Sequence, residues 1–183
     1  MSELMFPTPE PEPRPDRLRP EPAPALLITA FGEPAPQGSK TLMPNGRMVE
    51  ASSKLEPWRD AVASYTMVAR SRVRGWRPLT GPIEVSMVFT LARPRSHYGT
   101  GANAGKLRPS APLRPHSTPD LDKLARATGD ALKKGLAYKD DALVVGFRTL
   151  AKHYPEDHSW VADVLHKPGC VIRLWPLTAQ GDQ

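Results

Sequence analysis

Apolar residues recur along the chain with a period of two in some segments, and each such segment predicts a strand. The clearest alternation lies at 82–91, where one side of a strand with one wet face would carry Ile83, Val85, Met87, Phe89 and Leu91. Short apolar runs at 25–31 and 170–176 predict two further strands. A fourth strand, at 142–152, is expected to be buried, and Asn45-Gly46 between apolar pairs predicts a small hairpin at 42–49.

Two other segments have the 3.6-residue period of an amphipathic helix. The first helix is expected at 54–70, with Ser53 and Glu56 as a capping box. The second is expected at 120–134 and ends at Gly135; it would bury Leu121, Leu124, Thr128 and Leu132. Strands and helices in this order predict a single α+β domain, in which two main helices pack on a mixed β-sheet.

Composition divides the 183-residue chain into one domain with two tails. Residues 1–24 hold eight of the 22 prolines and little that could be buried, so they are expected to be a disordered Pro-rich tail. The folded domain is expected at 25–178, and 179–183 form a C-terminal tail. A core of ordinary size fits this length, whereas two typical domains do not.

Charge separates the same regions. The tail has five acidic and three basic residues, which leaves residues 25–183 with a net charge of +8. A basic domain attracts polyanions such as nucleic acid, although a surplus that serves only solubility fits equally well. No apolar run approaches 18 residues, the start lacks a signal-peptide core, and the single Cys170 excludes an internal disulfide framework. A cytoplasmic protein, in a bacterial or phage-infected cell, is expected.

A long basic loop is expected at 93–118. It has no acidic residue, and its glycines and prolines argue against regular structure; its bases are Arg93, Arg95, Lys106, Arg108 and Arg114. Structureless loops of this length are uncommon in compact domains unless they are functional or disordered. The loop could close on an anionic ligand, or it could be a solvated insertion.

Carboxylates gather at two places, Asp120 with Asp122 and Asp140 with Asp141. Residues two apart in a helix point to nearly opposite sides, so Asp120 and Asp122 can share a site only if Asp120 precedes the helix in extended chain. Pro119 makes that arrangement plausible. Helix capping would explain one aspartate at this position, but it does not account for the second pair at the start of a strand.

Three carboxylates that converge in a basic surface repel one another unless a cation lies among them, and hard oxygen ligands suit Mg²⁺ or Mn²⁺. Such a metal beside a basic groove is the arrangement of metal-dependent nucleases, and Arg126 could offset charge that develops on the phosphate. A calcium loop does not fit, because Leu124 occupies the third ligand position.

The segments PDLDKLARATGDAL and AYKDDALVV resemble the signature of the RusA family of Holliday junction resolvases, with weaker agreement at GEPAPQGSK. The resemblance spans about residues 119–152. It implies a homodimeric, magnesium-dependent endonuclease, with Mn²⁺ able to substitute, that nicks opposed strands of a four-way DNA junction symmetrically. By motif position, Asp120, Asp122 and Asp141 would bind the metal. Arg126 stands where the family usually has a catalytic lysine, and Lys123 where it has asparagine.

Other assignments compete with this one. Zinc binding is disfavoured. The spacing between the four candidate ligands matches no common zinc finger; these are His153, His158, His166 and Cys170. The tryptophans Trp58, Trp160 and Trp175 are more typical of a core or an interface than of base stacking. If the protein binds a DNA junction, six basic residues are expected to contact its phosphates: Lys40, Arg93, Arg95, Lys123, Arg148 and Lys152. A non-cleaving junction-binding or architectural protein and a basic RNA-binding domain are the alternative functions.

Overall fold

The computed structural model describes residues 22–38, 40–42, 48–50 and 53–177. The predicted tails fall outside these residues, apart from 22–24, and so does the Asn45-Gly46 turn. On either side of that turn, β2 (Lys40–Leu42) and β3 (Met48–Glu50) pair antiparallel, as expected for a hairpin. Within the described residues, no helix is long and apolar enough to cross a membrane.

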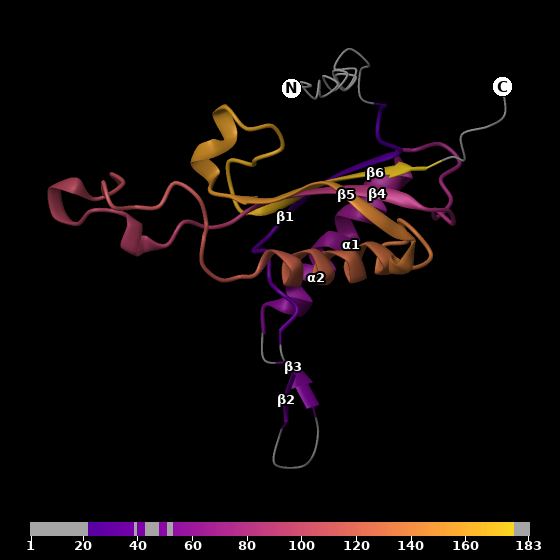
Figure 1. Ribbon diagram of the computed structural model, residues 1–183, viewed down its shortest axis with the longest axis horizontal. Helices are drawn as coiled ribbons and strands as arrows, with labels where there is room; N and C mark the ends of the chain where they lie inside the picture. The colour runs from indigo at the N-terminus through magenta and orange to yellow at the C-terminus, as the bar shows by residue number, and fades with distance from the viewer. Residues whose placement is uncertain (1–21, 39, 43–47, 51–52, 178–183) are drawn as a thin grey trace, which may run out of the picture.

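A four-stranded mixed sheet forms the centre of the fold (Figure 1). Its strand order is β1-β6-β4-β5, and the strands are β1 (Leu26–Phe31), β4 (Ile83–Thr90), β5 (Val144–His153) and β6 (Gly169–Pro176). β6 is antiparallel to both of its neighbours, whereas β4 and β5 run parallel. The alternation at 82–91 therefore belongs to a central strand, and β5 is an edge strand.

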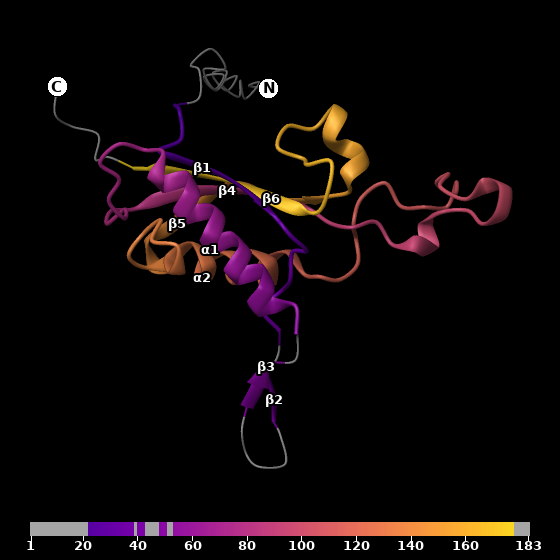
Figure 2. The ribbon, with the colours of Figure 1, turned by 180° about the vertical axis from the view of Figure 1, so that it is seen from behind.

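Both main helices, α1 (Leu55–Ser71) and α2 (Leu121–Lys134), lie on one face of the sheet (Figures 1 and 2). Their contact is fixed by a buried hydrogen bond of 3.1 Å, which Trp58 Nε1 donates to Thr128 Oγ1. Leu124 and Leu132 of α2 are fully buried in the same core as Met87 and the other inward residues of β4. The predicted α+β architecture is confirmed.

Three local predictions are wrong. The strand at 82–91 has no wet face, because β4 lies in the middle of the sheet; Ser86 and Thr90 are buried and Glu84 is half-buried. Ser53 and Glu56 form no capping box, since Lys54 is the residue before α1 and gives no side-chain cap, while Glu56 binds Arg59 at 3.1 Å. The strand at 142–152 is not buried, because β5 lies at the sheet edge; Val145 and Phe147 are 60% and 47% exposed.

The basic loop, residues 93–118, has more structure than its composition suggests, and we call it the arm. It contains two short 3₁₀ turns, Arg95–His97 and Gly101–Asn103. The second turn lies within a narrow hairpin, whose two sides are joined by bridges from Tyr98 to Leu107 and from Gly99 to Ala104. The arm projects from the end of the molecule at which α2 begins (Figure 1).

Candidate active site

The entrance of α2 places Asp120 and Asp122 in different backbone environments. Asp120 precedes the helix with φ −68° and ψ 139°, in extended chain after a cis Thr118–Pro119 bond, while Asp122 lies in the first turn. The Asp120 carboxylate accepts no capping hydrogen bond. The two aspartates therefore have the arrangement that a shared site requires, and the Asp120 carboxylate does not act as a helix cap.

The Asp120 carboxylate instead binds Lys123, with 2.7 Å between Oδ2 and Nζ. Both side chains are about half exposed, at 48% and 47%. The hydrogen bond and charge of Lys123 lower the pKa of Asp120, and the same contact raises the pKa of Lys123. Water surrounds this pair, so it is a weak restraint on the carboxylate.

Three of the predicted site residues meet at one cavity between α2 and β5. Asp122, Arg126 and Asp141 line it, and its volume is about 340 Å³. Its floor and walls are mostly apolar and come from Met87, Ala125, Gly129, Tyr138, Val144, Phe147 and Leu150. Asp120 does not line the cavity. The structure thus brings together one aspartate from the helix entrance, one from the lip of β5 and the arginine one turn beyond Asp122.

The two aspartates of the second acidic pair, Asp140 and Asp141, have different contacts. Asp140 precedes the 3₁₀ turn Asp141–Leu143 and accepts a hydrogen bond of 3.0 Å from the Ala142 backbone N–H, so it is a capping residue. Its other contact is with Lys133 Nζ at 2.8 Å, and these hydrogen bonds, that of Lys133 above all, lower the pKa of Asp140 to about 2. Asp141, 3.8 Å from the same ammonium and 54% exposed, faces the cavity.

A divalent metal fits part of this arrangement. Among the described residues, no three His, Cys, Asp or Glu side chains are grouped closely enough to hold a metal ion. The expected three-carboxylate cluster is therefore not assembled in this conformation, because Asp120 is directed to Lys123. Asp122 and Asp141 are both open to this cavity, and either carboxylate suits Mg²⁺, which keeps several water ligands and commonly takes one or two carboxylates together with phosphate oxygens.

Most of the predicted phosphate contacts are engaged within the protein. Arg148 Nε binds Glu84 at 2.7 Å and its guanidinium covers the Trp175 ring. Arg93 has a side chain only 4% exposed and binds Glu156. Lys123 holds Asp120, and the Lys40 side chain lies outside the described residues. Arg95 is exposed and has no side-chain partner among the residues that the structure describes.

Lys152 has a role that the sequence did not reveal. Its ammonium donates hydrogen bonds to the backbone carbonyls of Ser117, at 2.7 Å, and Pro119, at 2.9 Å. These bonds tie the end of β5 to the chain just before Asp120. Lys152 therefore positions the entrance of α2, and the contact joins residues more than 30 positions apart, so no local pattern could have predicted it.

Tyr138 was also missed, because its position in a turn-rich stretch suggested no role. It is fully buried beneath the cavity and donates a hydrogen bond of 2.8 Å to the Gly129 carbonyl. Burial raises its pKa, so the phenol is neutral and does not act as a base near neutral pH. Tyr138 is a structural part of the cavity floor.

Comparison with known families agrees with the geometry. The model of the family described as endodeoxyribonuclease RusA matches residues 32–162, which is well over half of the chain and includes Asp120, Asp122, Arg126 and Asp141. A comparison with curated proteins finds no match. The resemblance drawn from the motifs is confirmed. The chain belongs to the RusA family of endodeoxyribonucleases.

Proposed function

We propose that the protein is a magnesium-dependent endonuclease that resolves four-way DNA junctions by paired symmetric nicks. The observation that carries the proposal is the meeting of Asp122, Arg126 and Asp141 at one open cavity in a chain of an endodeoxyribonuclease family. The net charge of +8 on residues 25–183 supports a polyanionic substrate. Recombination, repair or phage DNA processing in the cytoplasm is the proposed setting.

Asp122 and Asp141 would hold the metal, and Asp120 could join them after leaving Lys123. A bound Mg²⁺ or Mn²⁺ would supply Lewis-acid chemistry at the scissile phosphate and lower the pKa of a water molecule. Arg126, exposed at the cavity, would offset the negative charge that develops on the phosphate. It cannot donate a proton near neutral pH, so the leaving oxygen must take its proton from water rather than from this side chain.

Paired cleavage requires two copies of the site. In the part of the chain that the structure describes, Asp122, Arg126 and Asp141 form one such site, and a four-way junction has two-fold symmetry, so two nicks on opposed strands need a symmetric dimer. We therefore propose a homodimer as the active form. Sedimentation or light scattering on the purified protein, alone and with a junction, would measure this state directly.

Cleavage of a labelled mobile junction tests the proposal. Wild-type protein should cut it in Mg²⁺ or Mn²⁺, should not cut in EDTA, and should cut linear duplex poorly. Asp122→Asn should abolish cutting and keep binding, because the carboxylate serves the metal rather than the DNA. Asp60→Asn is the matched control: it makes the same change at an exposed aspartate of α1 that binds Lys134, and it should cut normally.

A second candidate is a junction-binding protein that does not cut. It is favoured by Arg126, which replaces the family's usual lysine, and by Lys123, which occupies Asp120. Tight binding of the junction in Mg²⁺ and Mn²⁺ with no cleavage across many junction sequences would establish it and would refute the nuclease proposal. Preferential binding of structured RNA in competition with junction DNA would refute both.

A further inference from the structure

The five basic residues of the arm separate into two groups by their contacts. Arg93 and Arg114 bind acidic residues of the segment 154–157, at the base of the arm. The other three, Arg95, Lys106 and Arg108, are exposed along the arm itself. This division suggests that the first group holds the arm in place and that the second group is available to a ligand.

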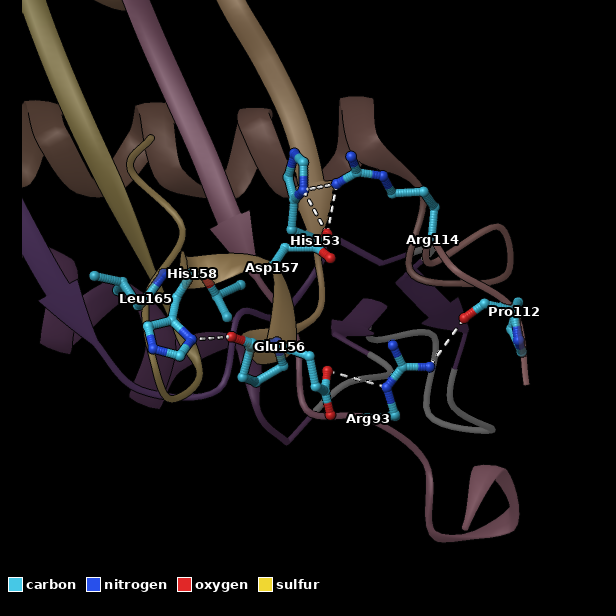
Figure 3. A network of polar contacts seen from close by, with 10 residues as sticks. Arg93, Pro112, Arg114, His153, Glu156, Asp157, His158 and Leu165 are labelled. Atoms are coloured by element: carbon cyan, nitrogen blue, oxygen red, sulfur yellow. Dashed lines mark hydrogen bonds and ion pairs between the residues drawn. The ribbon is translucent and has the colours of Figure 1, made fainter. Parts of the chain in front are cut away.

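Arg93 fixes the start of the arm. Its Nε atom lies 3.1 Å from Glu156 Oε2, and its Nη1 donates a hydrogen bond of 2.9 Å to the Pro112 carbonyl, near the end of the arm (Figure 3). The guanidinium covers the Tyr154 ring at 3.9 Å, and Tyr98 donates a 2.9 Å hydrogen bond to the other oxygen of Glu156. With its side chain 4% exposed, Arg93 is an anchor and cannot reach a phosphate.

Arg114 fixes the end of the arm. Its Nη1 atom lies 2.5 Å from Asp157 Oδ2, and the same carboxylate oxygen lies 2.9 Å from His153 Nδ1 (Figure 3). The Asp157 side chain is only 2% exposed. A buried carboxylate that loses its cation is costly, so this contact holds the returning chain strongly. Both ends of the arm are thus bound to the same short segment after β5.

The hairpin within the arm is ordered by its own backbone. Gly99 donates its N–H to the Lys106 carbonyl at 2.9 Å, and Arg108 donates to the His97 carbonyl at 2.9 Å. A Cβ atom on Gly99 would lie 2.7 Å from the Asn103 carbonyl oxygen, so only glycine fits there. Such an arm presents its side chains in a defined arrangement, which an unstructured insertion does not do.

The three outward bases face solvent without acidic partners. The arm contains no Asp or Glu, and no ion pair of these three side chains occurs among the residues that the structure describes; the Arg108 guanidinium donates one hydrogen bond, to the Tyr98 carbonyl. The arm leads directly into Pro119 and Asp120, and it extends from the α2-entrance end of the molecule (Figures 1 and 2). Its positive charge therefore extends outward from the end of the molecule that holds Asp120 and Asp122.

We propose that the arm is a clamp for the phosphate backbone of the DNA duplex next to the cut site, with Arg95, Lys106 and Arg108 as its phosphate contacts and Glu156 and Asp157 as the residues that position it. The partner's identity as DNA rests on the proposed function. Phosphates carry no sequence information, so the clamp adds affinity and orientation without choosing the cleavage sequence.

Salt dependence of binding tests the clamp. Binding of a fluorescent junction is measured in EDTA at several salt concentrations for wild type and for R95Q/K106Q/R108Q. Each lost phosphate contact lowers the magnitude of the slope of log K against log salt by about 0.9, so the triple variant should be shallower by about 2 to 3. The control R72Q/R74Q/R77Q removes the same charge from exposed arginines at the opposite end of the molecule, and its slope should change far less.

The outcomes separate the clamp from the nuclease proposal. If wild type binds and cuts junctions while the two triple variants have equal slopes, the clamp is wrong and the nuclease proposal stands. If wild type neither binds nor cuts, both fail. If R95Q/K106Q/R108Q loses affinity for duplex RNA but not for DNA, the assignment of DNA as the ligand of the arm is wrong. Thermal melting checks that the variants fold. If the triple variant does not fold, Lys106→Gln alone replaces it in the salt titration, and its slope should be shallower by about 0.9.

Glu156→Gln tests the positioning role separately. It makes the protein more positive by one charge, so bulk electrostatics alone would strengthen binding of DNA. Loss of the contacts to Arg93 and Tyr98 would loosen the arm and weaken binding despite that charge. Weaker binding supports the anchor, and equal or tighter binding overturns it.

Discussion

Charged residues at the base of the arm and at the entrance of α2 differ in how deeply their ion pairs are buried. At the base of the arm, the side chains of Arg93 and Asp157 are 4% and 2% exposed. At the helix entrance, Asp120 and Lys123 are each about half exposed. Both regions contain close ion pairs, so proximity of opposite charges does not distinguish them. The two regions differ in how far the paired side chains are exposed to solvent.

Burial decides which of these pairs a ligand can replace. Removing one partner of a buried pair leaves an uncompensated charge in a poorly solvated place, and the fold resists that change. An exposed pair is weak, because water already solvates both groups, so a metal ion or a phosphate can take one partner from the other. The base of the arm is therefore part of the fold, whereas the helix entrance has charges that can be redirected.

The strongest test makes the same substitution in both regions. Asp157→Asn should lower the free energy of unfolding by about 3 kcal/mol, the low end of the range for a broken buried pair because Arg114 is 46% exposed. For a chain of this size, that corresponds to a fall in Tm of roughly 6–12 °C. Asp122→Asn, at an exposed position, should leave Tm nearly unchanged. Thermal denaturation of both variants measures the contrast, and equal shifts in Tm would contradict it.

Arg126 and Arg93 allow a second matched comparison. The main effect is expected on the cleavage rate, through Arg126, and it is smaller in free energy than the effect of Asp157→Asn on stability. Arg126→Gln should lower the junction cleavage rate by about a hundredfold, as expected for loss of one group that stabilises developing charge. Arg126→Lys should retain most of the rate, since the charge remains. Neither change should lower Tm, whereas Arg93→Gln should, because Arg93 is buried. A cleavage rate unaffected by Arg126→Gln would remove that residue from the site.

Periodic patterns predicted where the apolar side chains of the core lie, although β4 is buried on its other side as well. The alternation from Ile83 to Leu91 and the stripe that includes Leu124 and Leu132 correspond to buried positions in β4 and α2. The sequence could not predict that β5 is an edge strand, because strand order depends on contacts between distant segments. The order within the arm was missed because glycine-dependent backbone hydrogen bonds such as that of Gly99 have no period.

The candidate site was predictable where its residues share one helix. Asp122 and Arg126 are four positions apart, so they lie on the same face of α2 and reach the same cavity. Asp141 was added by the family motif, and its place beside α2 depends on the parallel pairing of β4 and β5. The direction of the Asp120 side chain was not predictable, since Lys123 three positions later and a metal compete for the same carboxylate.

That competition leads to the smallest of the expected effects. Lys123→Gln should free Asp120 to join Asp122 and Asp141, and the affinity for Mn²⁺ or Mg²⁺ should rise roughly two- to fivefold, the scale of an exposed ion pair. The control is Lys134→Gln on the same helix, where Lys134 binds Asp60 at the same 2.7 Å and is also exposed. Both variants lose one positive charge, so a general electrostatic effect would tighten metal binding in both. Calorimetric titration of each variant with Mn²⁺ alone separates the two cases: a rise only in Lys123→Gln identifies Asp120 as a ligand that its neighbour restrains, whereas equal affinities exclude Asp120 from the metal site.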